Sequence, residues 1–519
     1  MTRSYEAAIA ALNSLQTNFA IVEELKKSTS REDLNKRSLP ETVEWLRRIG
    51  YKPSDLNQLN LIHVAGTKGK GSTSAFISSI LSQYTQSEPG QSSPRLHKVG
   101  LFTSPHLRFA RERIVIDNAP LSEEQFARYF FEVWDRLENA AKAAGEDPVS
   151  LSTKPQYFRY LTLMAFHTYM SEGVDAAVIE CGIGGEYDCT NVIEQPKATA
   201  ITSLGIDHTA MLGTTIEKIA WHKGGIIKSG ARAFTAPQPP SAEQVLAERA
   251  AAKGTQLDVV SEHPELRAGT SQVKLGLAGD FQYTNASVAV AAAAEFLRKT
   301  GVANISENVM SEPLPAKFKT GLEETRLGGR CETRFEKNVA WYIDGGHTLE
   351  SIRLAGQWFA SRIHADSSSD LAAKKPRILI FNQQTRDSTA LARALHETLA
   401  AALGSGTPFT HALFCTNITY KQAGFRPDLV SMNTNADDLE LLRVQKSLAA
   451  AWNEIDPNAE TQVFGTIEEA VNFARDVAAQ ERKVVQKDEA PVMTFVTGSI
   501  HLVGGFLDVI ETKPYTETA

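Results

Sequence analysis

Apolar and polar residues are ordered in a way that predicts strands and helices in turn along most of the chain. Short apolar runs of strand length are separated by longer segments in which apolar residues recur at helical spacing. In the first part of the chain the runs predict strands at Leu59–Ala65, Lys98–Thr103, Val174–Cys181, Ala198–Leu204 and Arg232–Ala236. The helical spacing predicts helices at Ser72–Leu81, Glu123–Ala144, Tyr157–Met170, Thr215–Ile227 and Asn285–Thr300. Strands that alternate with helices are typical of a parallel α/β sheet.

The alternation starts again beyond Arg330. There it predicts strands at Ala340–Asp344, Ile378–Asn382, Ala412–Thr416 and Val492–Thr497, and helices at Leu349–Ile363, Ala390–Leu403, Asp437–Ile455 and Ile467–Gln480. A chain of 519 residues is too long to fold around one hydrophobic core. We therefore predict two α/β domains, residues 1–330 and 331–519, with Arg330 at the hinge between them. Polar, serine-rich stretches at Ser87–His97 and Ala365–Lys375 predict surface loops.

Composition narrows the class of protein. Hydrophobic residues make up 42% of the chain and charged residues 22%, which is usual for a globular protein. A net charge of −7 argues against a general nucleic-acid-binding protein. The four cysteines have neither metal-site spacing nor the density of a disulfide framework, so we expect a reducing compartment. No apolar run approaches the roughly 18 residues that span a bilayer, and the first residues lack a secretory signal pattern.

A glycine-rich segment between the first predicted strand and the first predicted helix carries the strongest chemical signal. It has the sequence HVAGTKGKGS and ends at Ser72. Glycines let backbone N–H groups turn toward phosphates, and the start of a helix adds positive potential. Lys70 can reach the β- and γ-phosphates of a nucleotide, and the hydroxyl of Ser72 or Thr73 can lie near a bound magnesium ion. The match to the usual phosphate loop is imperfect because Gly71 separates Lys70 from Ser72, but the strand–loop–helix context predicts ATP binding.

Other predicted strands of the first part end in residues suited to a metal ion. Glu180 lies at the end of one strand, before a glycine turn, and Asp207 and His208 follow another. A carboxylate beside a phosphate loop suits Mg²⁺, which prefers oxygen ligands. From the pattern alone, Ser104 marks only a turn, and Lys223 is best explained as a solvent-exposed helix lysine.

The second part also carries polar residues at the ends of its predicted strands. Asp344 is followed by two glycines and His347, and an acid in that position suits the hydroxyls of a ribose. The alternative is an ordinary turn that caps the next helix. Ser499 follows the last predicted strand, where a helix N-terminus can hold a small carboxylate-bearing substrate.

Taken together, these segments closely resemble those of folylpolyglutamate synthases, members of the Mur-ligase superfamily of ATP-dependent amide-forming ligases. The resemblance extends from the phosphate loop to the segment GSIH that begins at Gly498, and the loop form GTKGKGS resembles the eukaryotic branch. It implies an N-terminal P-loop ATPase-type domain that also binds folate. A smaller C-terminal Rossmann-like α/β domain would bind glutamate and contribute to the ATP site between the two domains.

The resemblance also implies roles for individual residues. The ATP-binding residues are Gly66, Thr67, Lys68, Gly69, Lys70, Gly71, Ser72, Asn285, Arg330 and Asp344. The magnesium ligands are Ser104, Glu180, His208 and Lys223, the last as a carbamylated lysine. The catalytic residues are Lys70, His208, Lys223 and Arg330. Glutamate is bound by His347 and Ser499, and folate by Asp188 and Thr190, a pair equally well explained as a structural turn.

Glutamate addition to a reduced folate is the activity that the resemblance implies. ATP would convert the terminal γ-carboxylate into an acyl phosphate, which the amine of L-glutamate attacks. Mg²⁺ is the expected cofactor, K⁺ is an additional cation, and the partners are reduced folate, L-glutamate and ATP. We expect a cytoplasmic monomer with a mitochondrial form, no nucleic-acid partner and no integral membrane segment. Two alternatives stay open: a dihydrofolate synthase, alone or combined with this activity, and a nucleotide-binding module without catalysis.

Overall fold

The chain divides into two compact units, which are described one at a time. The computed structural model describes residues 3–26, 31–85, 96–267, 273–366, 376–384, 387–421, 428, 442–484 and 491–512. The first unit comprises Met1–His106, Ala110–Gly276 and Asp280–Leu327, and the second comprises Leu107–Phe109, Leu277–Gly279 and Gly328–Ala519. The change of unit at Gly328 lies close to the boundary expected after Arg330, and it places Arg330 in the second unit. Most of the two expected surface loops, and the first part of the expected helix Asp437–Ile455, lie outside the described residues.

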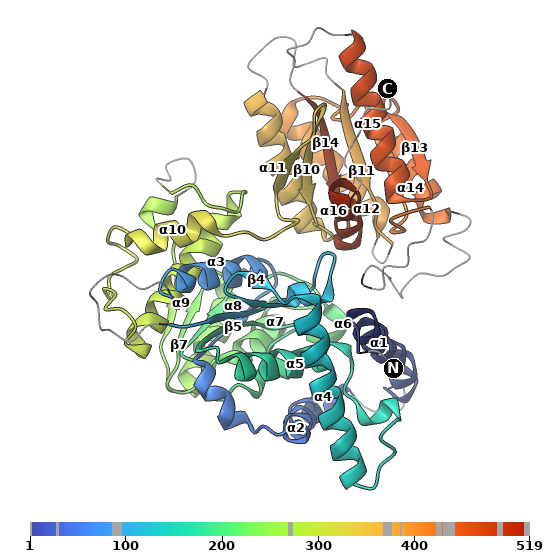
Figure 1. Ribbon diagram of the computed structural model, residues 1–519. Helices are drawn as coiled ribbons and strands as arrows, with labels where there is room; N and C mark the ends of the chain where they lie inside the picture. Colours follow the sequence, from blue (N-terminus) through green and yellow to red (C-terminus); the bar gives the residue numbers. More distant parts are fainter. Residues whose placement is uncertain are drawn as a thin grey trace. The chain divides into compact units, whose positions relative to one another are not determined.

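The first unit is built on one twisted sheet (Figure 1). Its described strands are β1 (Leu61–Ala65), β2 (Val99–Phe102), β3 (Ile114–Ile116), β4 (Ala119–Pro120), β5 (Ala176–Glu180), β6 (Ala198–Ile201), β7 (Arg232–Thr235) and β8 (Leu257–Val259). They lie in the order β4-β3-β2-β5-β1-β6-β7-β8. The strands from β2 to β8 in this order are parallel, and β3 and β4 add an antiparallel edge. The five strands predicted for this part are confirmed, and β1 is central and buried along its whole length.

Helices cover both faces of this sheet. The described α-helices are α1 (Tyr5–Lys26), α2 (Arg31–Arg48), α3 (Lys70–Ser82), α4 (Glu123–Ala143), α5 (Tyr157–Glu172), α6 (Thr209–Leu212), α7 (Ile216–Lys223), α8 (Pro240–Ala252), α9 (Phe281–Thr300) and α10 (Ala316–Glu324). Short 3₁₀ turns include η4 (Cys189–Val192) and η5 (Gly224–Ile226). α3, α9 and α10 pack together on one face, and α4, α5, α7 and α8 belong to the cores of the other.

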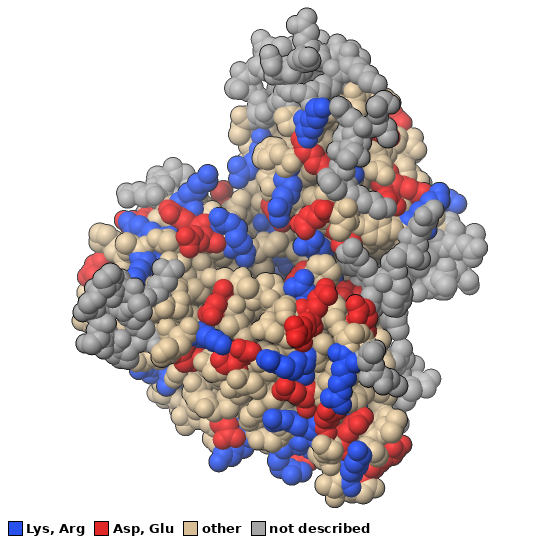
Figure 2. Space-filling view, in the orientation of Figure 1, with Lys and Arg blue, Asp and Glu red and all other residues tan. Residues whose placement is uncertain are grey.

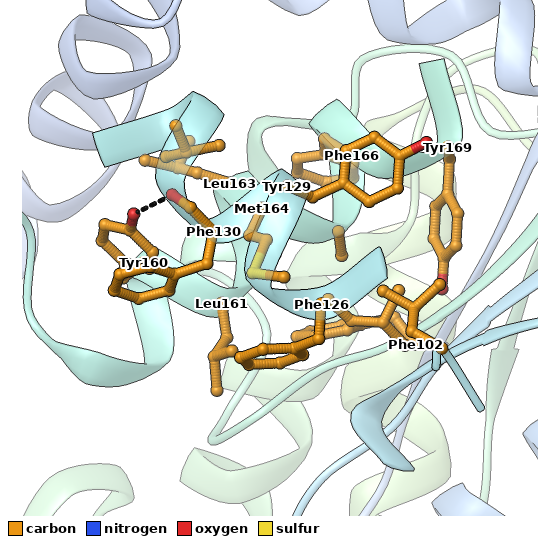
Figure 3. Close-up of a cluster of buried hydrophobic side chains, with 14 of the residues drawn as sticks. Phe102, Phe126, Tyr129, Phe130, Tyr160, Leu161, Leu163, Met164, Phe166 and Tyr169 are labelled. Carbon is orange, nitrogen blue, oxygen red and sulfur yellow. Dashed lines mark hydrogen bonds between the residues drawn. The ribbon is translucent and has the colours of Figure 1, made fainter. Parts of the chain in front are cut away.

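The largest core of the first unit is aromatic (Figure 3). Helix α4 begins at a capping box in which the Ser122 hydroxyl accepts the N–H of Gln125 and the Gln125 side chain accepts the N–H of Ser122. Its apolar face, at Phe126 and Phe130, then packs against α5 and the sheet. The Tyr160 hydroxyl donates to the Phe130 carbonyl at 2.8 Å, so even this buried phenol is satisfied. The cluster packs α4 and α5 against β1, β2 and β5.

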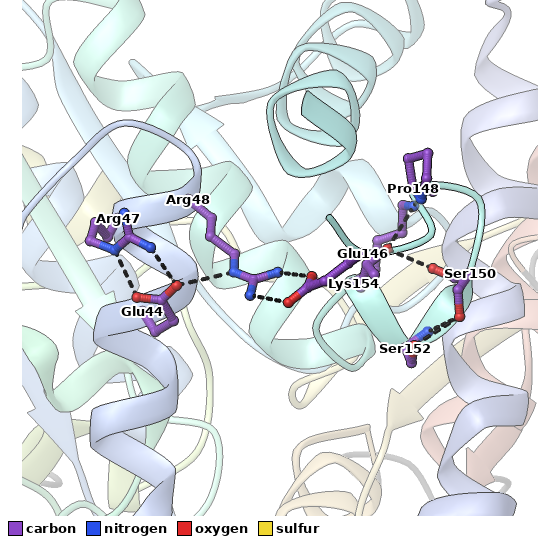
Figure 4. Close-up of polar contacts among 9 residues, drawn as sticks. Glu44, Arg47, Arg48, Glu146, Pro148, Ser150, Ser152 and Lys154 are labelled. Carbon is purple, nitrogen blue, oxygen red and sulfur yellow. Dashed lines mark hydrogen bonds and ion pairs between the residues drawn. The ribbon is translucent and has the colours of Figure 1, made fainter. Parts of the chain in front are cut away.

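Polar contacts tie the end of α2 to the connection that follows α4 (Figure 4). Arg48 donates two hydrogen bonds to Glu146, at 2.7 and 2.8 Å, and a third to Glu44 at 3.1 Å. The Arg48 side chain is only 15% exposed, so these pairs are less screened than ordinary surface ion pairs. Nearby, the buried Lys154 ammonium donates to the Pro148 carbonyl at 2.6 Å. These contacts anchor α2 to a segment about a hundred residues further along the chain.

The second unit has its own sheet. Its described strands are β9 (Glu332–Phe335), β10 (Val339–Asp344), β11 (Arg377–Phe381), β12 (His411–Cys415), β13 (Glu460–Phe464) and β14 (Val492–Thr497), in the order β13-β12-β11-β14-β10-β9. Only β9 among them is antiparallel. The described α-helices are α11 (Leu349–Asp366), α12 (Ser388–Leu403), α14 (Arg443–Ile455), α15 (Ile467–Val484) and α16 (Ile500–Thr512). Helices α15 and α16 share one core with the sheet, and α12 packs against both α11 and α14.

On the face shown in Figure 2, Lys and Arg side chains are interspersed with Asp and Glu. Among the described helices, none is both long and apolar enough to cross a membrane.

Candidate functional site

The phosphate loop joins the end of β1 to the start of α3, as predicted. Gly66 has a φ of +148°, and a Cβ at this residue would lie 1.8 Å from the Thr202 hydroxyl oxygen. Gly69 has a φ of +85°, and a Cβ there would lie 2.1 Å from the side-chain oxygen of Asn285. Only glycine therefore fits at either position. The first N–H groups of α3 have no partner within the helix, so the loop ends in a set of donors suited to an anion.

The two lysines of the loop approach different acids. The Lys70 ammonium lies 4.0 Å from the Glu180 carboxylate, and their side chains are 17% and 3% exposed. The Lys68 ammonium donates to Asp207 at 3.2 Å. The structure therefore brings together Lys70, the first residue of α3, and Glu180, the last residue of β5, because the loop follows β1 and β1 is the neighbour of β5 in the sheet.

Glu180 is also held from the other side. The Ser104 N–H donates to the Glu180 carboxylate at 2.9 Å, which places two of the predicted magnesium ligands next to each other. Mg²⁺ bound with a nucleotide is usually held by one or two protein oxygens together with phosphates and water. A buried carboxylate and a serine beside a phosphate loop fit that donor set.

His208 is placed differently from the prediction. Strand β6 ends at Ile201, so Asp207 and His208 lie in the loop beyond it, and their expected position at a strand end is wrong. His208 is exposed, has a φ of +50° and directly precedes the short helix α6 as its N-cap residue. Within the described residues, no three His, Cys, Asp or Glu side chains gather as a metal site. A ligand role for His208 stays a prediction.

Lys223 ends helix α7 with its side chain inside the protein. It is only 3% exposed, and its ammonium donates to the Gly66 carbonyl of the phosphate loop at 2.7 Å. Burial, together with the positive charge of Lys70, lowers the pKa of Lys223 to about 7. The pattern-based expectation of a solvent-exposed lysine is wrong, because α7 and η5 turn the residue back under the loop.

Asn285 lies in the second turn of α9, which begins four positions earlier than predicted, at Phe281. Its side-chain amide donates to Gln282 at 2.9 Å, and Gln282 in turn donates to the Ser72 hydroxyl at 3.2 Å. The chain of contacts links α9 to the first turn of α3. It sets the position of Ser72, one of the hydroxyls predicted to lie near the nucleotide.

The predicted folate pair, Asp188 and Thr190, is buried in a turn. Asp188 is 7% exposed and Thr190 fully buried. The Asp188 carboxylate accepts the N–H groups of Thr190 and Ile183, both at 2.9 Å, and the Thr190 hydroxyl at 2.6 Å. Thr190 also lies 2.8 Å from the imidazole of His63, a residue to which the sequence pattern gave no role. The structural turn is thus observed, and a contact with folate stays a prediction.

In the second unit, Asp344 organises the turn at the end of β10. Its carboxylate accepts the N–H of Cys331 at 2.9 Å and the N–H of Gly346 at 2.8 Å. Burial raises the pKa of Asp344, and the nearby Arg330 opposes that rise. Arg330 also donates to the Gly329 carbonyl at 3.0 Å. The two residues predicted to contact the nucleotide from this part of the chain are therefore close neighbours.

The predicted glutamate ligands lie at the same edge of this sheet. The His347 imidazole is 3.0 Å from the Gly345 carbonyl, and the Ser499 hydroxyl accepts the N–H groups of His501 and Leu502 at the start of α16. Beyond the ends of β11 and β12 lies a set of side-chain amides that the sequence pattern did not reveal. Each donates to the next, from Gln445 to Asn382, then to Asn417, then to Gln384. No local pattern marks these amides, since their partners are distant in sequence.

The fold is that of the two-domain Mur-ligase type, and the named relatives make the chain an ATP-dependent ligase. Each of the two units is built on a mainly parallel α/β sheet. The first unit carries a phosphate loop with Glu180, Lys70 and Lys223 around it. The chain belongs to the folylpolyglutamate synthase family.

Two curated relatives establish the family. The chain is 45% identical over 510 residues to the folylpolyglutamate synthase of Neurospora crassa, a match that covers 98% of this chain and 92% of the relative. It is 44% identical over 513 residues to the folylpolyglutamate synthase of Saccharomyces cerevisiae strain FostersO, covering 98% and 87%. No protein-family model matches the chain.

Solved structures support the fold. A point mutant of the L. casei enzyme aligns with a TM-score of 0.61 at 21% identity and covers 99% of this chain and 100% of its own. Mycobacterium tuberculosis folylpolyglutamate synthase complexed with ADP and AMPPCP aligns with a TM-score of 0.63 at 22% identity, covering 93% and 100%. E. coli FolC in complex with DHPP and ADP aligns with a TM-score of 0.60 at 22% identity, covering 91% and 94%.

Proposed function

We propose that this enzyme adds L-glutamate through a γ-linkage to tetrahydrofolate and its polyglutamates, with ATP as the energy source. The observation that carries the proposal is the grouping of Lys70, Glu180 and Lys223 around the phosphate loop, in a chain whose relatives bear the name folylpolyglutamate synthase. Each of the three comes from a different segment. A loop that survived only as a structural turn would not need them together.

The chemistry begins with a carboxylate, which is a poor electrophile. The γ-carboxylate oxygen of the folate attacks the terminal phosphorus of ATP, so that an acyl phosphate forms and ADP leaves. The α-amine of free L-glutamate then attacks the acyl carbon, and the tetrahedral intermediate expels phosphate and loses a proton. Lys70 and the N–H groups at the start of α3 would stabilise the charge on the transferred phosphoryl group. No side chain needs to form a covalent intermediate.

Mg²⁺ is the proposed cofactor, and Glu180 with Ser104 would hold it; the ion would neutralise charge on the phosphates. Lys223 would contribute after carbamylation, since a carbamate offers the oxygen ligands that an amine lacks. Carbamylation needs a neutral amine, and a pKa of about 7 leaves a large fraction of Lys223 neutral near pH 7. His208 is the fourth proposed ligand.

The remaining assignments complete the proposal. Arg330 and Asp344 would contact the nucleotide, His347 and Ser499 the incoming glutamate, and Asp188 and Thr190 the folate. K⁺ is proposed as an additional cation. We propose a cytoplasmic monomer with a mitochondrial form, which sedimentation and cell fractionation would test.

An incorporation assay tests the activity directly. Labelled L-glutamate and ATP are supplied with either tetrahydrofolate or dihydropteroate, and products are separated by chain length. Serial addition to tetrahydrofolate alone is expected. Product from dihydropteroate would instead indicate a dihydrofolate synthase or a bifunctional enzyme. ATP binding with no amide product from either acceptor would refute the ligase proposal.

A matched pair of variants ties the assay to the site. Lys223→Met removes the buried amine beneath the phosphate loop, and Lys218→Met changes an exposed lysine on the same helix. We expect Lys223→Met to abolish measurable addition and Lys218→Met to keep the rate of the unchanged enzyme. Equal rates in both variants would exclude Lys223 from the reaction.

A further inference from the structure

His63 is a fully buried polar residue in the middle of the central strand. Its neighbours on the same side of β1, Leu61 and Ala65, belong to apolar cores. The imidazole Nε2 lies 2.8 Å from the Thr190 hydroxyl and 3.1 Å from the Cys181 thiol, and Nδ1 has no hydrogen-bond partner among the described residues. Burying a histidine in such surroundings is costly unless its hydrogen bonds offset the lost contact with water.

The protonation of this contact follows from the distances. The Thr190 hydroxyl lies 2.6 Å from the Asp188 carboxylate, which is the separation of a hydroxyl that donates to a carboxylate. The Thr190 hydroxyl therefore donates its proton to Asp188, and toward His63 its oxygen acts as the hydrogen-bond acceptor. This assigns the proton to Nε2 of a neutral imidazole. Burial agrees with a neutral ring, since it lowers the pKa of His63 to about 3.

The Asp188 carboxylate connects Thr190 to the turn after Glu180 by hydrogen bonds. Its second oxygen accepts the N–H of Ile183 at 2.9 Å, within the glycine turn that follows the end of β5. Glu180 is the last residue of β5 and faces Lys70 and Ser104. A continuous set of hydrogen bonds thus runs from the strand before the phosphate loop to the turn after the acid.

We propose that His63 is a positioning residue that, through Thr190 and Asp188, fixes the turn at Ile183 and thereby sets the Glu180 carboxylate relative to the phosphate loop. The proposal rests on the proposed function for the role of Glu180. It gives His63 no part in proton transfer. It also gives the buried pair Asp188 and Thr190 a use that does not require contact with folate.

Hydrogen exchange of the intact enzyme tests the structural half of the proposal. In His63→Leu the donor is lost, so the amide of Ile183 should exchange about tenfold faster, which corresponds to one weakened buried hydrogen bond. His63→Gln keeps an N–H donor at a similar reach and should restore most of the protection. Thr199→Val is the matched control, because Thr199 lies beside His63 on β6, is fully buried and has no hydroxyl partner among the described residues. It should leave the exchange at Ile183 unchanged.

A double-variant cycle tests the route. If His63 acts through Thr190, His63→Leu should have little further effect on exchange at Ile183 in a Thr190→Val background. Additive effects would overturn the route. Unchanged exchange at Ile183 in a folded His63→Leu enzyme would overturn the proposal itself.

Kinetics and metal dependence supply the functional half. His63→Leu should lower kcat for glutamate addition by about tenfold, raise the Mg²⁺ concentration for half-maximal rate, and change KM for ATP by less than about threefold. His63→Gln should recover most of kcat. If the unchanged enzyme adds no glutamate, the proposed function fails, and the exchange results still decide the positioning role. If the unchanged enzyme is active and His63→Leu matches it in kcat and Mg²⁺ dependence, the positioning role fails alone.

Discussion

Gly69→Ala gives the sharpest test of the phosphate loop. The new Cβ would lie 2.1 Å from Oδ1 and 2.8 Å from Cγ of Asn285, and the backbone φ of +85° would be strained for alanine. The strain costs about 1 kcal/mol. Asn285 is 4% exposed and donates to Gln282 at 2.9 Å, so moving it would break a buried hydrogen bond worth about 1–3 kcal/mol.

Together these terms amount to about 2–4 kcal/mol. If the loss falls on the nucleotide-binding conformation, affinity for a non-hydrolysable ATP analogue should fall by roughly 30- to 1,000-fold. Titration calorimetry measures the affinity, and thermal unfolding measures how much of the cost appears as lost stability. Gly173→Ala separates strain from collision, because Gly173 has a φ of +67° and open space around its Cβ. It should lose about 1 kcal/mol of stability and no affinity.

A second variant checks the contact itself. Asn285→Ala makes room for the new Cβ, so Gly69→Ala should cost less in that background than alone. If Gly69→Ala binds the analogue within about threefold of the unchanged enzyme and unfolds at the same temperature, the loop conformation described here is not the one that binds phosphate.

Three further outcomes are expected. Lys223 has a pKa of about 7 in the folded enzyme and an ordinary value of 10.5, so between these pH values the unfolded chain binds more protons than the folded enzyme. The unfolding free energy, measured in CO₂-free buffer relative to Lys223→Met, should therefore rise with pH in this range by up to about 1.4 kcal/mol per pH unit. Below pH 7 this difference should not change with pH. A fall with pH in a denaturant titration would contradict the assigned burial. Phe130 lies in the aromatic core shown in Figure 3, so Phe130→Ala should lower the free energy of unfolding by about 3–5 kcal/mol. A loss below about 1 kcal/mol would mean that the core is not packed as described. Ser499→Ala should raise KM for glutamate more than KM for ATP. It should also destabilise α16 by about 1 kcal/mol, because the helix loses its N-cap hydroxyl. Equal changes in both KM values would show that Ser499 is not part of the glutamate site.

The relation between sequence and structure is clearest in the strands. The predicted strands were short stretches rich in apolar residues, and each is present in its sheet. The strands β3, β4, β8, β9 and β13 were not predicted; the last four lie at an edge, and β3 is a three-residue strand next to the edge strand β4. An edge strand has one neighbour and partly exposed residues, so it needs no continuous apolar run. For helix α16 only an N-terminus beyond Ser499 was expected, and its extent was not predicted, because its apolar residues cover more than one face.

Local order along the chain by itself determined the two α/β sheets, the phosphate loop and the position of Glu180 at the end of its strand. These features depend on residues close in sequence, whose periodicity and turn chemistry are readable without a fold. Tertiary structure alone decided that Lys223 is buried beneath Gly66, that His208 is exposed on a loop, and that His63 meets Thr190. Burial and partners of this kind arise from segments more than a hundred residues apart in the chain. No local pattern can specify them, because the pKa of an amine and the use of an imidazole depend on what other segments pack around them.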